Sequence, residues 1–482
     1  MVDTIAIIGA GFSGTVTAVN LLRSAPGRPL RIVLINRGAM ARGLAYGTAS
    51  PLHVLNVPAG NMSALADDAD DFLHYCRWAD PATTPGSFVS RRLYGCYLEA
   101  LLTAAANTAP EGTVLEQWMG EVARIHVASD GRSAWVALDD GRQLQVQRAV
   151  LAFGHLPPRQ PSSRRPDLFA DARYVPDPWL PGVLERVSPA EPVLLIGSGL
   201  TAIDVALSLQ QRGRTAPIWM LSRRGLLSAS HREQRPPLAP GVAAPLIDAL
   251  PASARGLLRE LRRAAADSAA AGQDWRDLLA ALRPHVPALW QRMTDTERRR
   301  FLRHLQPYWD VTRHRCAPQP SAVFRRLLEQ GELRLLAGRL QDFELEPGGV
   351  RARWTPRGGT TERELVVGAV VNCTGPDTDL ARAESPLLRQ LIASGLLLPD
   401  ALKLGLSVDA RGALLGRDGR PSAVLSYVGP WLRARDWEAT AVPELRIHAQ
   451  RMAARLLQEL TAQAASGCVE SKPVLLSNAL AG

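Results

Sequence analysis

Two glycine-rich stretches have the spacing that holds the diphosphate group of a dinucleotide. They are Gly9-Ala10-Gly11-Phe12-Ser13-Gly14 and Gly197-Ser198-Gly199-Leu200-Thr201-Ala202. In the G-x-G-x-x-G/A pattern, the first glycine permits a tight turn and the second lets the backbone approach the pyrophosphate. The third position, glycine or alanine, lets the following helix pack on the strand. Because the phosphates then meet the N–H groups of a helix N-terminus, we expect dinucleotide contacts at Gly9, Gly11, Phe12, Ser13, Gly14, Gly197, Gly199 and Thr201.

The residue that ends the strand after each loop is placed to contact the ribose. Asn36 stands where an acid usually accepts from the ribose hydroxyls, and an amide can still accept one such bond. The alternative is that Asn36 only starts a turn. After the second unit, Arg223 and Arg224 could pair with a 2′-phosphate, which favours NADPH, or form a solvated arginine pair. NADH stays open.

Four polar residues are candidates for the reacting end of the site. Asn56 ends a polar loop that begins at His53, and we expect this loop to lie near a cofactor, although Asn56 could simply be a turn residue. Arg313 and His314 could bind an anionic substrate or cofactor phosphates, or form a structural interdomain ion pair. Glu438 is a candidate contact for substrate or cofactor. We find no Ser–His–Asp or Cys–His arrangement.

The cysteines and the charge narrow the classes of function. The five cysteines contain no C-x-x-C pair, so we expect neither a metal site nor a dithiol redox centre. Lys and Arg number 56 against 46 Asp and Glu, and this diffuse excess suits an anionic substrate or cofactor phosphates better than nucleic acid. Genomic bias toward arginine is an equal explanation. With no signal peptide or apolar span, we expect a cytoplasmic protein that binds neither membrane nor nucleic acid.

The glycine loops lie within two predicted β-α-β units. The first comprises Ile5–Ile8, Thr15–Leu22 and Arg31–Ile35, and the second comprises Pro192–Ile196, Ile203–Gln211 and Pro217–Leu221. Between them we predict a helix over Arg91–Ala106 and a small antiparallel region made of Val122–Val127, Ala134–Leu138 and Leu144–Val150.

The rest of the chain predicts a helical insertion over residues 236–319. Its segments are Ala254–Ala266, Trp275–Leu282 and Asp295–Leu305; strands Leu333–Leu336 and Val366–Asn372 and a final helix Pro443–Leu460 follow. The predicted fold is α/β, with two Rossmann-like dinucleotide-binding domains and this insertion. We place the first part of the first domain at 1–190, the second domain at 191–335 and the remainder of the first at 336–482.

Several longer stretches resemble the FAD-NAD(P)-binding family of bacterial single-component flavoproteins. They are Gly43–Thr48, His53–Ala59, Met62-Ser63, Arg91–Leu98, Ser222–Leu227, Arg303–Pro318 and Trp437–Arg446. Val150–His155 and Val371–Pro376 resemble the "ATG" turns of such enzymes, and Tyr427–Pro430 resembles their C-terminal flavin loop, with Pro430 where many relatives have Asp. The resemblance implies FAD at the first loop and NAD(P)H at the second. It also implies cofactor contacts at His53, Gly154, Gly375, Gly429 and Thr440.

The same resemblance implies a reaction. The family includes a urate hydroxylase and amino-group N-oxygenases, in which NAD(P)H reduces FAD and O₂ then forms a C4a-hydroperoxyflavin that oxygenates a nucleophile. Our first expectation is an FAD-dependent monooxygenase that converts urate to 5-hydroxyisourate in purine catabolism. One alternative is an N-oxygenase of an amino acid or amine. The other is a flavin-dependent NAD(P)H:acceptor reductase.

Overall fold

The computed structural model describes residues 2–469 except 26–28, 162, 165, 233–246 and 248. Its first sheet has the strand order β15-β16-β7-β1-β2-β3. These strands are β1 (Asp3–Ile8), β2 (Leu30–Asn36), β3 (Thr113–Met119), β7 (Arg148–Leu151), β15 (Ala413–Leu415) and β16 (Pro421–Tyr427). All neighbouring pairs are parallel except β15 with β16. Strand β1 lies inside the sheet and is almost wholly buried, which explains its uninterrupted apolar run.

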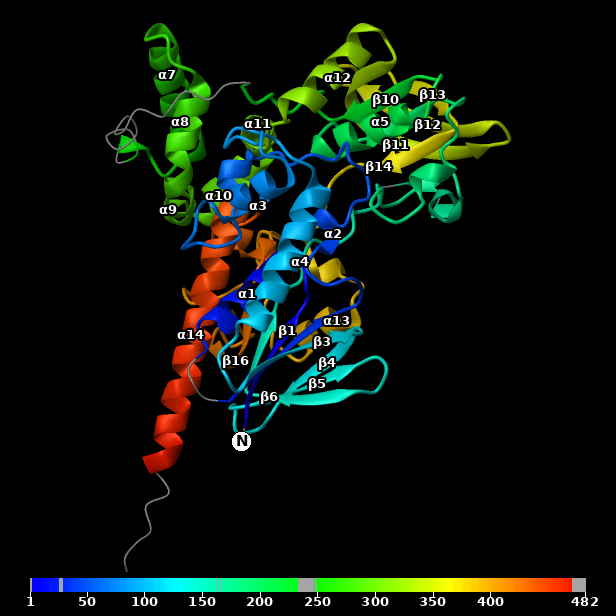
Figure 1. Cartoon of the computed structure of the whole chain (residues 1–482). Helices are drawn as coiled ribbons and strands as arrows, with labels where there is room; N and C mark the ends of the chain where they lie inside the picture. The colour runs from blue at the N-terminus through cyan, green and yellow to red at the C-terminus, as the bar shows by residue number, and fades with distance from the viewer. Residues whose placement is uncertain are drawn as a thin grey trace, which may run out of the picture.

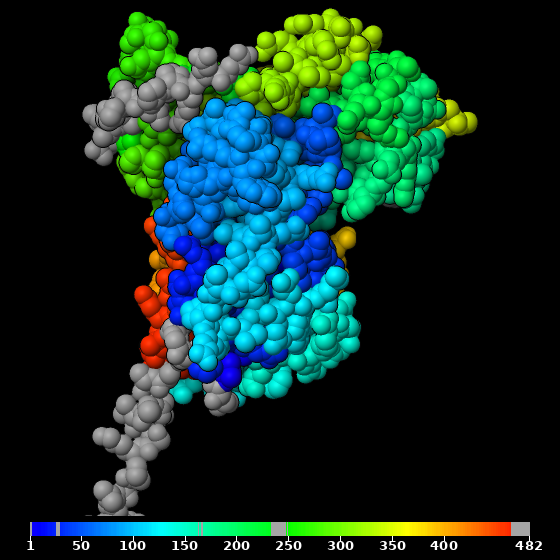
Figure 2. Space-filling model, viewed as in Figure 1, coloured from blue at the N-terminus to red at the C-terminus, as the bar shows by residue number. Residues whose placement is uncertain are grey.

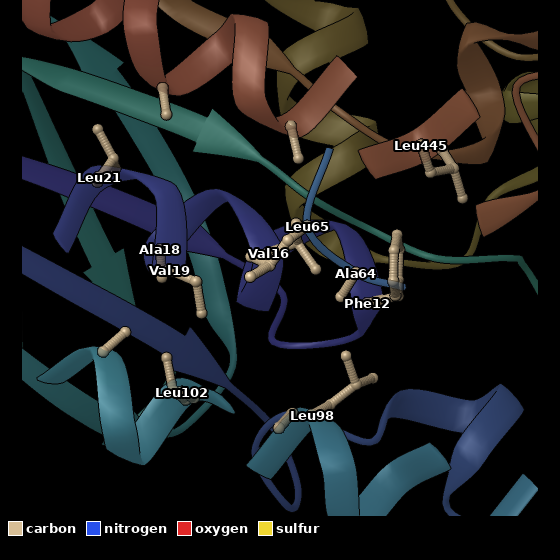
Figure 3. Close-up of a cluster of buried hydrophobic side chains, with 14 of the residues drawn as sticks. Phe12, Val16, Ala18, Val19, Leu21, Ala64, Leu65, Leu98, Leu102 and Leu445 are labelled. Carbon is tan, nitrogen blue, oxygen red and sulfur yellow. The ribbon is translucent and has the colours of Figure 1, made fainter. Parts of the chain in front are cut away.

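Helix α1 (Phe12–Arg23) is the central helix on one face of this sheet. It packs against α4 (Arg91–Asn107) and α14 (Val442–Val469). Figure 3 shows its side chains Val16 and Val19 within the cluster that also contains Leu98 and Leu445. Because apolar neighbours surround α1, the orientation of the glycine loop at its start is fixed by the core.

The small antiparallel sheet is confirmed, with one difference. It consists of β4 (Val122–Val127), β5 (Ala134–Leu138) and β6 (Gln143–Val146). The predicted strand Leu144–Val150 is in fact two strands, because β6 ends at Val146 and β7 then joins the parallel sheet beside β1. Helix α13 (Pro386–Ala393) packs against β4.

The second sheet has the order β13-β12-β11-β10-β9-β14-β8. Its strands are β8 (Tyr174–Val175), β9 (Val193–Ile196), β10 (Ile218–Ser222), β11 (Leu333–Glu346), β12 (Gly349–Pro356), β13 (Arg363–Val367) and β14 (Ala369–Asn372). Helix α5 (Leu200–Gln211) follows β9, and α12 (Pro318–Glu329) packs against α5. The α/β class with two Rossmann-like sheets is thus confirmed, and Figure 1 shows the second sheet apart from the first.

The expected boundaries at residues 191 and 335 do not match this sheet. Strand β8 joins it before 191, and β11 to β14 continue it to Asn372. Pairing partners decide which sheet a strand joins, and β14 pairs with β9 from more than 170 residues away. A local pattern does not contain that information.

Most of the predicted helical insertion is present, although residues 236–246 of it lie outside the described residues. Its helices are α7 (Ala254–Ala270), α8 (Trp275–Leu282), α9 (Val286–Arg292), α10 (Asp295–His304) and α11 (Gln306–Arg313). The indole Nε1 of Trp290 donates to the carbonyl of Ala434 at 3.0 Å, so the insertion is anchored on the C-terminal segment. In Figure 2 the blue residues near 70–110 lie between this insertion and the second sheet.

The remaining short elements connect these layers. They are α2 (Gly43–Tyr46), α3 (Asp71–Ala79), and the 3₁₀ turns η1 (Ala59–Asn61), η2 (Pro166–Ala170), η3 (Leu184–Arg186), η4 (Arg283–His285), η5 (Leu380–Arg382) and η6 (Pro430–Ala434). None of the described helices is both long and apolar enough to cross a membrane.

Candidate functional site

The two glycine loops share one local environment. Gly9 has φ +106° and Gly197 has φ +115°, which side chains rarely allow. A Cβ on Gly9 would lie 2.6 Å from the carbonyl oxygen of Ala152, and one on Gly197 would lie 2.5 Å from that of Cys373. Each loop therefore lies directly against the turn that follows the neighbouring parallel strand, β7 or β14.

Both helices that follow these loops begin without a side-chain cap. The N-caps are Gly11 for α1 and Gly199 for α5, and neither helix has an acid in its first turn. Four other helices are capped by side chains, those of Ser90, Ser253, Asp274 and Thr294. An uncapped N-terminus leaves N–H donors and the positive end of the helix dipole available to an anion.

The space in front of each N-terminus is open. A Cβ on Gly11 would meet no closer atom than Cα of Gly43 at 3.7 Å, and one on Gly199 would meet nothing within 4 Å. Gly14 has a different function, because a Cβ there would lie 1.9 Å from the carbonyl oxygen of Gly9. The residues at both loops therefore fit dinucleotide phosphates, with Phe12, Ser13 and Thr201 in the first helical turns.

Asn36 holds a turn. Its Oδ1 accepts from the backbone N–H of Ala10 at 3.3 Å, and its Nδ2 donates to the carbonyls of Gly38 and Ala39 at 3.0 and 2.8 Å. Both ends of the amide are thus used inside the protein. These bonds favour the turn interpretation, and a ribose contact stays a prediction.

The two arginines after β10 differ in their surroundings. Arg224 donates from Nη2 to the carbonyl of Arg303 at 3.1 Å and stacks over Tyr308, both in the helical insertion. Arg223 is exposed. Of the pair, Arg223 is therefore the better candidate for a 2′-phosphate.

The loop from His53 to Asn56 faces the second domain. The buried ring of His53 bonds to Thr48 Oγ1 through Nδ1 at 2.6 Å and to Ser208 Oγ of α5 through Nε2 at 2.8 Å. Both ring nitrogens are occupied by protein groups, so a direct cofactor contact of His53 lacks structural support. Asn56 is half-buried, and its backbone carbonyl accepts from Nε2 of His231 at 2.9 Å.

The loop Tyr427–Pro430, which resembles a C-terminal flavin loop, is hydrogen-bonded to the turn that follows β7. The hydroxyl of Tyr427 donates to the carbonyl of Phe153 at 3.0 Å and accepts from the N–H of Trp431 at 3.1 Å. Gly429 then begins η6 with φ +148°, beside Phe153. Gly154, Gly375 and Thr440 stay predictions as cofactor contacts; a Cβ on either glycine would meet nothing within 4 Å.

Three of the predicted reacting residues gather in one charged group, which we call the arginine cluster. It comprises Arg283, Asp310, Arg313, His314, Arg433, Glu438 and Glu444. Nη2 of Arg313 lies 2.8 Å from Oε2 of Glu438, and these side chains are only 11% and 3% exposed. Two nitrogens of Arg283 contact the Glu444 carboxylate at 2.6 Å. Asn56 is not among the residues that these ion pairs bring together.

Among the three arginines of the cluster, Arg433 has the longest ion-pair distance, and the motifs did not single it out. Its guanidinium lies 3.9 Å from the ring centroid of Trp437, and its nearest acid oxygen, Oδ1 of Asp310, is 3.8 Å away. The Nε atoms of Arg433 and Arg313 are enclosed and have no hydrogen-bond partner among the described residues. Buried donors of this kind need a partner, which a ligand can supply.

The arginine cluster lies close to the turn that follows β7, because Arg433 affects the pKa of His155 in that turn. Desolvation by the surrounding protein and the positive charge of Arg433 lower the pKa of His155, which follows Gly154. Desolvation, then Arg313, Arg433 and Arg283, lower the pKa of His314, so its imidazole is neutral at pH 7. Desolvation raises the pKa of Asp310. The sequence offered one signal for Arg433, which is its position four residues after Gly429.

Other reactive groups do not assemble elsewhere in the described chain. Burial raises the pKa of Cys76 to about 11 and that of Cys316 to about 12, and no three potential metal ligands gather among the described residues. A depression of about 380 Å³ lies beside Asn20 and Arg23, at the end of α1 remote from the glycine loop. It is therefore separate from the candidate site.

Two sheets with matching glycine loops define a fold with two dinucleotide-binding domains. Residues 6–156 match the model of a family described as FAD-NAD(P)-binding. This segment is thus similar to the FAD-NAD(P)-binding family, as its motifs predicted, and the match bears out FAD and NAD(P)H as the expected cofactors.

Two curated proteins are similar over part of the chain. One is nitrosuccinic acid synthase of Aspergillus oryzae, 28% identical over 242 residues, which are 43% of this chain and 36% of that protein. The other is the nitrosuccinate-forming L-aspartate N-monooxygenase of Streptomyces davaonensis, 27% identical over 282 residues. That match covers 48% of this chain and 42% of the relative. The chain thus spans well under half the length of these relatives.

Solved structures share the fold over nearly the whole chain. The ornithine hydroxylase of Pseudomonas aeruginosa in its reduced form has a TM-score of 0.62 at 17% identity, covering 95% of this chain and 100% of that one. L-lysine 6-monooxygenase of Pseudomonas syringae has a TM-score of 0.64 at 17% identity and covers 95% and 100%. At this identity the likeness shows the fold alone.

Proposed function

We propose that this protein is an FAD- and NAD(P)H-dependent monooxygenase that hydroxylates the nitrogen of an amino acid or a related amine. The curated relatives named above include an L-aspartate N-monooxygenase, and the solved structures include an ornithine and a lysine monooxygenase. Their names refer to amino acids and not to urate, so the N-oxygenase alternative replaces urate hydroxylation as the preferred reaction. For the substrate class we favour a dicarboxylic amino acid such as aspartate.

The observation that carries this proposal is the state of Arg433. It is largely buried, lies near the turn at Gly154, and its nearest acid oxygen is 3.8 Å away. A carboxylate is the natural partner of a guanidinium, because two parallel N–H donors match its two oxygens. Arg313 is already paired with Glu438. An incoming substrate carboxylate would therefore bind at Arg433.

The overall reaction is R–NH₂ + O₂ + NAD(P)H + H⁺ → R–NHOH + H₂O + NAD(P)⁺. When bound, FAD accepts a hydride from NAD(P)H and activates O₂, and the protein supplies binding and orientation. The N-termini of α1 and α5 would hold the two pyrophosphates. Trp437 covers one face of the Arg433 guanidinium and excludes water from it.

The substrate nitrogen must lose a proton before it can attack oxygen, and His314 is the candidate acceptor. Its imidazole is neutral because desolvation and three arginines lower its pKa. A carboxylate bound at Arg433 would offset part of that positive charge and so raise the pKa of His314. Substrate binding would therefore make Nε2 of His314 a stronger base, at the moment when a proton must be accepted.

The decisive experiment measures NAD(P)H oxidation by the purified holoenzyme with a panel of substrates. The panel contains aspartate, glutamate, ornithine, lysine, cadaverine and urate, and products are identified by mass spectrometry. We expect aspartate or glutamate to stimulate oxidation and to gain one oxygen atom on nitrogen. If urate alone stimulates oxidation, the N-oxygenase proposal is wrong. Reduction of quinones or dyes without any stimulation by an amine would instead support an acceptor reductase.

A variant pair tests the carboxylate site. Arg433→Ala should raise the KM for a dicarboxylic substrate at least tenfold, because one charge-assisted contact supplies about 1.4 kcal/mol or more. The KM for NAD(P)H should not change. Arg259→Ala is the control, because Arg259 lies in the helical insertion outside the arginine cluster and its side chain is 78% exposed. Equal effects of both substitutions would remove the basis for this role of Arg433.

A further inference from the structure

A buried ion pair links the two dinucleotide-binding domains. Nη2 of Arg91, the first residue of α4, lies 2.7 Å from Oδ2 of Asp204 on α5. The two side chains are 17% and 9% exposed. Helix α4 packs on α1 below the first glycine loop, whereas α5 starts at the second loop. The pair therefore joins the two helices that organise the two cofactor loops.

Arg91 is itself held rigidly by the first domain. Its backbone N–H donates to the carbonyl of His53 at 2.8 Å, and its Nε donates to that of Val54 at 3.2 Å. Its guanidinium also lies over the ring of Trp179, which follows β8 of the second sheet. Arg91 thus presents a fixed donor to Asp204.

A second contact runs beside the first. Nε2 of His53 bonds to Ser208 Oγ at 2.8 Å, one helical turn after Asp204 on α5. The hydroxyl of Ser208 also donates to the carbonyl of Asp204 at 2.9 Å. Two polar contacts on the same face of one helix fix its rotation about its axis as well as its position.

The stability of the folded protein does not explain why Arg91 and Asp204 form a buried ion pair. Desolvation raises the pKa of Asp204, so burial disfavours its charged form. Buried ion pairs commonly return no more free energy than a well-packed apolar pair would, but they specify one geometry. Asp204 lies five residues beyond Gly199 on α5, about 7 Å along the helix axis. A group that fixes Asp204 therefore fixes the cofactor loop.

We propose that Arg91 and Asp204, assisted by His53 and Ser208, are positioning residues that orient the nicotinamide-binding loop toward the flavin for hydride transfer. In that step a hydride leaves the nicotinamide and joins the flavin, which also takes a proton from solvent. Transfer needs the reacting atoms within roughly 3–3.5 Å, and an error near 1 Å costs about a hundredfold in rate. The inference rests on the proposed function only in assigning NAD(P)H to the second loop.

The test uses the FAD-loaded full chain with Asp204→Asn and, as a milder change, Ser208→Ala. Anaerobic stopped-flow measures the rate of flavin bleaching by saturating NADPH, and titration measures the Kd for NADP⁺. Hydrogen exchange follows α5 and residues 53–54. Glu116→Gln is the control, because the Glu116 carboxylate accepts hydrogen bonds from Arg31 and Trp118, which both lie in the first sheet.

We expect Asp204→Asn to slow bleaching at least tenfold while FAD content and the Kd for NADP⁺ stay within twofold. Exchange should rise at α5 and residues 53–54, and Ser208→Ala should show a smaller effect of the same kind. If Asp204→Asn lowers the melting temperature or the FAD content but leaves the limiting rate of flavin bleaching unchanged, the role of the pair is merely structural and the inference is overturned. If neither NADPH nor NADH bleaches the wild-type flavin, the proposed function fails first, and this role fails with it.

Discussion

Replacing Gly11 with alanine separates the protein's own needs from those of its cofactor. Gly11 has φ −78° and ψ −165°, an extended conformation that alanine adopts readily. The added methyl group would meet only Cα of Gly43, at 3.7 Å. The apoprotein should therefore fold with little change in stability, because the entropy gain of about 0.4–1 kcal/mol is offset by alanine's weaker preference for the N-cap position.

The cost should appear only in FAD binding. The methyl group would occupy the space through which the backbone approaches the pyrophosphate. The loss of one charge-assisted hydrogen bond costs about 1.5–3 kcal/mol, which corresponds to a rise in the Kd for FAD of about 10- to 150-fold. By contrast, Gly14→Ala should prevent folding, because its Cβ would lie 1.9 Å from the carbonyl oxygen of Gly9.

The assay is FAD titration of the apoprotein by fluorescence quenching, with the melting temperature of the same samples. Gly348→Ala is the control, because Gly348 lies in the second domain and its Cβ would meet nothing within 4 Å. If Gly11→Ala binds FAD within twofold of the wild type, the first loop does not hold the pyrophosphate. A loss of folding would show that Gly11 serves the protein itself.

Two further predictions concern cofactor choice and pH. Arg223→Ala should raise the KM for NADPH about tenfold, because it removes one charge-assisted contact. The KM for NADH should not change. Arg224→Ala should instead lower the melting temperature, since Arg224 binds the helical insertion. If Arg223→Ala changed the KM for NADPH and the KM for NADH equally, Arg223 would not bind the 2′-phosphate. Hydrogen bonds from Arg173 lower the pKa of Asp171 from 3.8 to about 2. Because the folded pKa lies below the unfolded one, this stabilisation exists above pH 4 and is lost toward pH 2. The difference in melting temperature between wild type and Asp171→Asn should therefore vanish near pH 2. A difference that is constant with pH would show that the ion pair with Arg173 does not stabilise the fold.

The sequence predicted the two loops because each is complete within a few consecutive residues. Gly9 and Gly197 both adopt the positive φ that the motif requires, and both lie against turns that the sequence also indicated. The extent of the second sheet was not predictable in this way. Strands β12 and β13 have ordinary alternating patterns, and only their pairing with β11 assigns them to it.

His53 shows a second limit of local reading. Its motif indicated a position near FAD, but its ring bonds to Ser208, which is 155 residues away. Similarly, Arg91 belongs to a family-like stretch whose sequence says nothing of Asp204. Contacts between domains depend on the relative placement of two cores, and neither core alone encodes that placement.

The arginine cluster shows how the structure changes the assignment of the substrate residue. Arg313 and Glu438 were separate candidates, yet at 2.8 Å they largely neutralise each other. Arg283 is likewise paired with Glu444. The third arginine, Arg433, has its nearest acid oxygen on Asp310 at 3.8 Å, and burial disfavours the charged form of Asp310. A ligand carboxylate would complete the third pair, because its two oxygens match two parallel donors of the guanidinium. The charge distribution of the cluster therefore supports our proposal of an anionic amine as substrate, with Arg433 rather than Arg313 as the residue that would bind it.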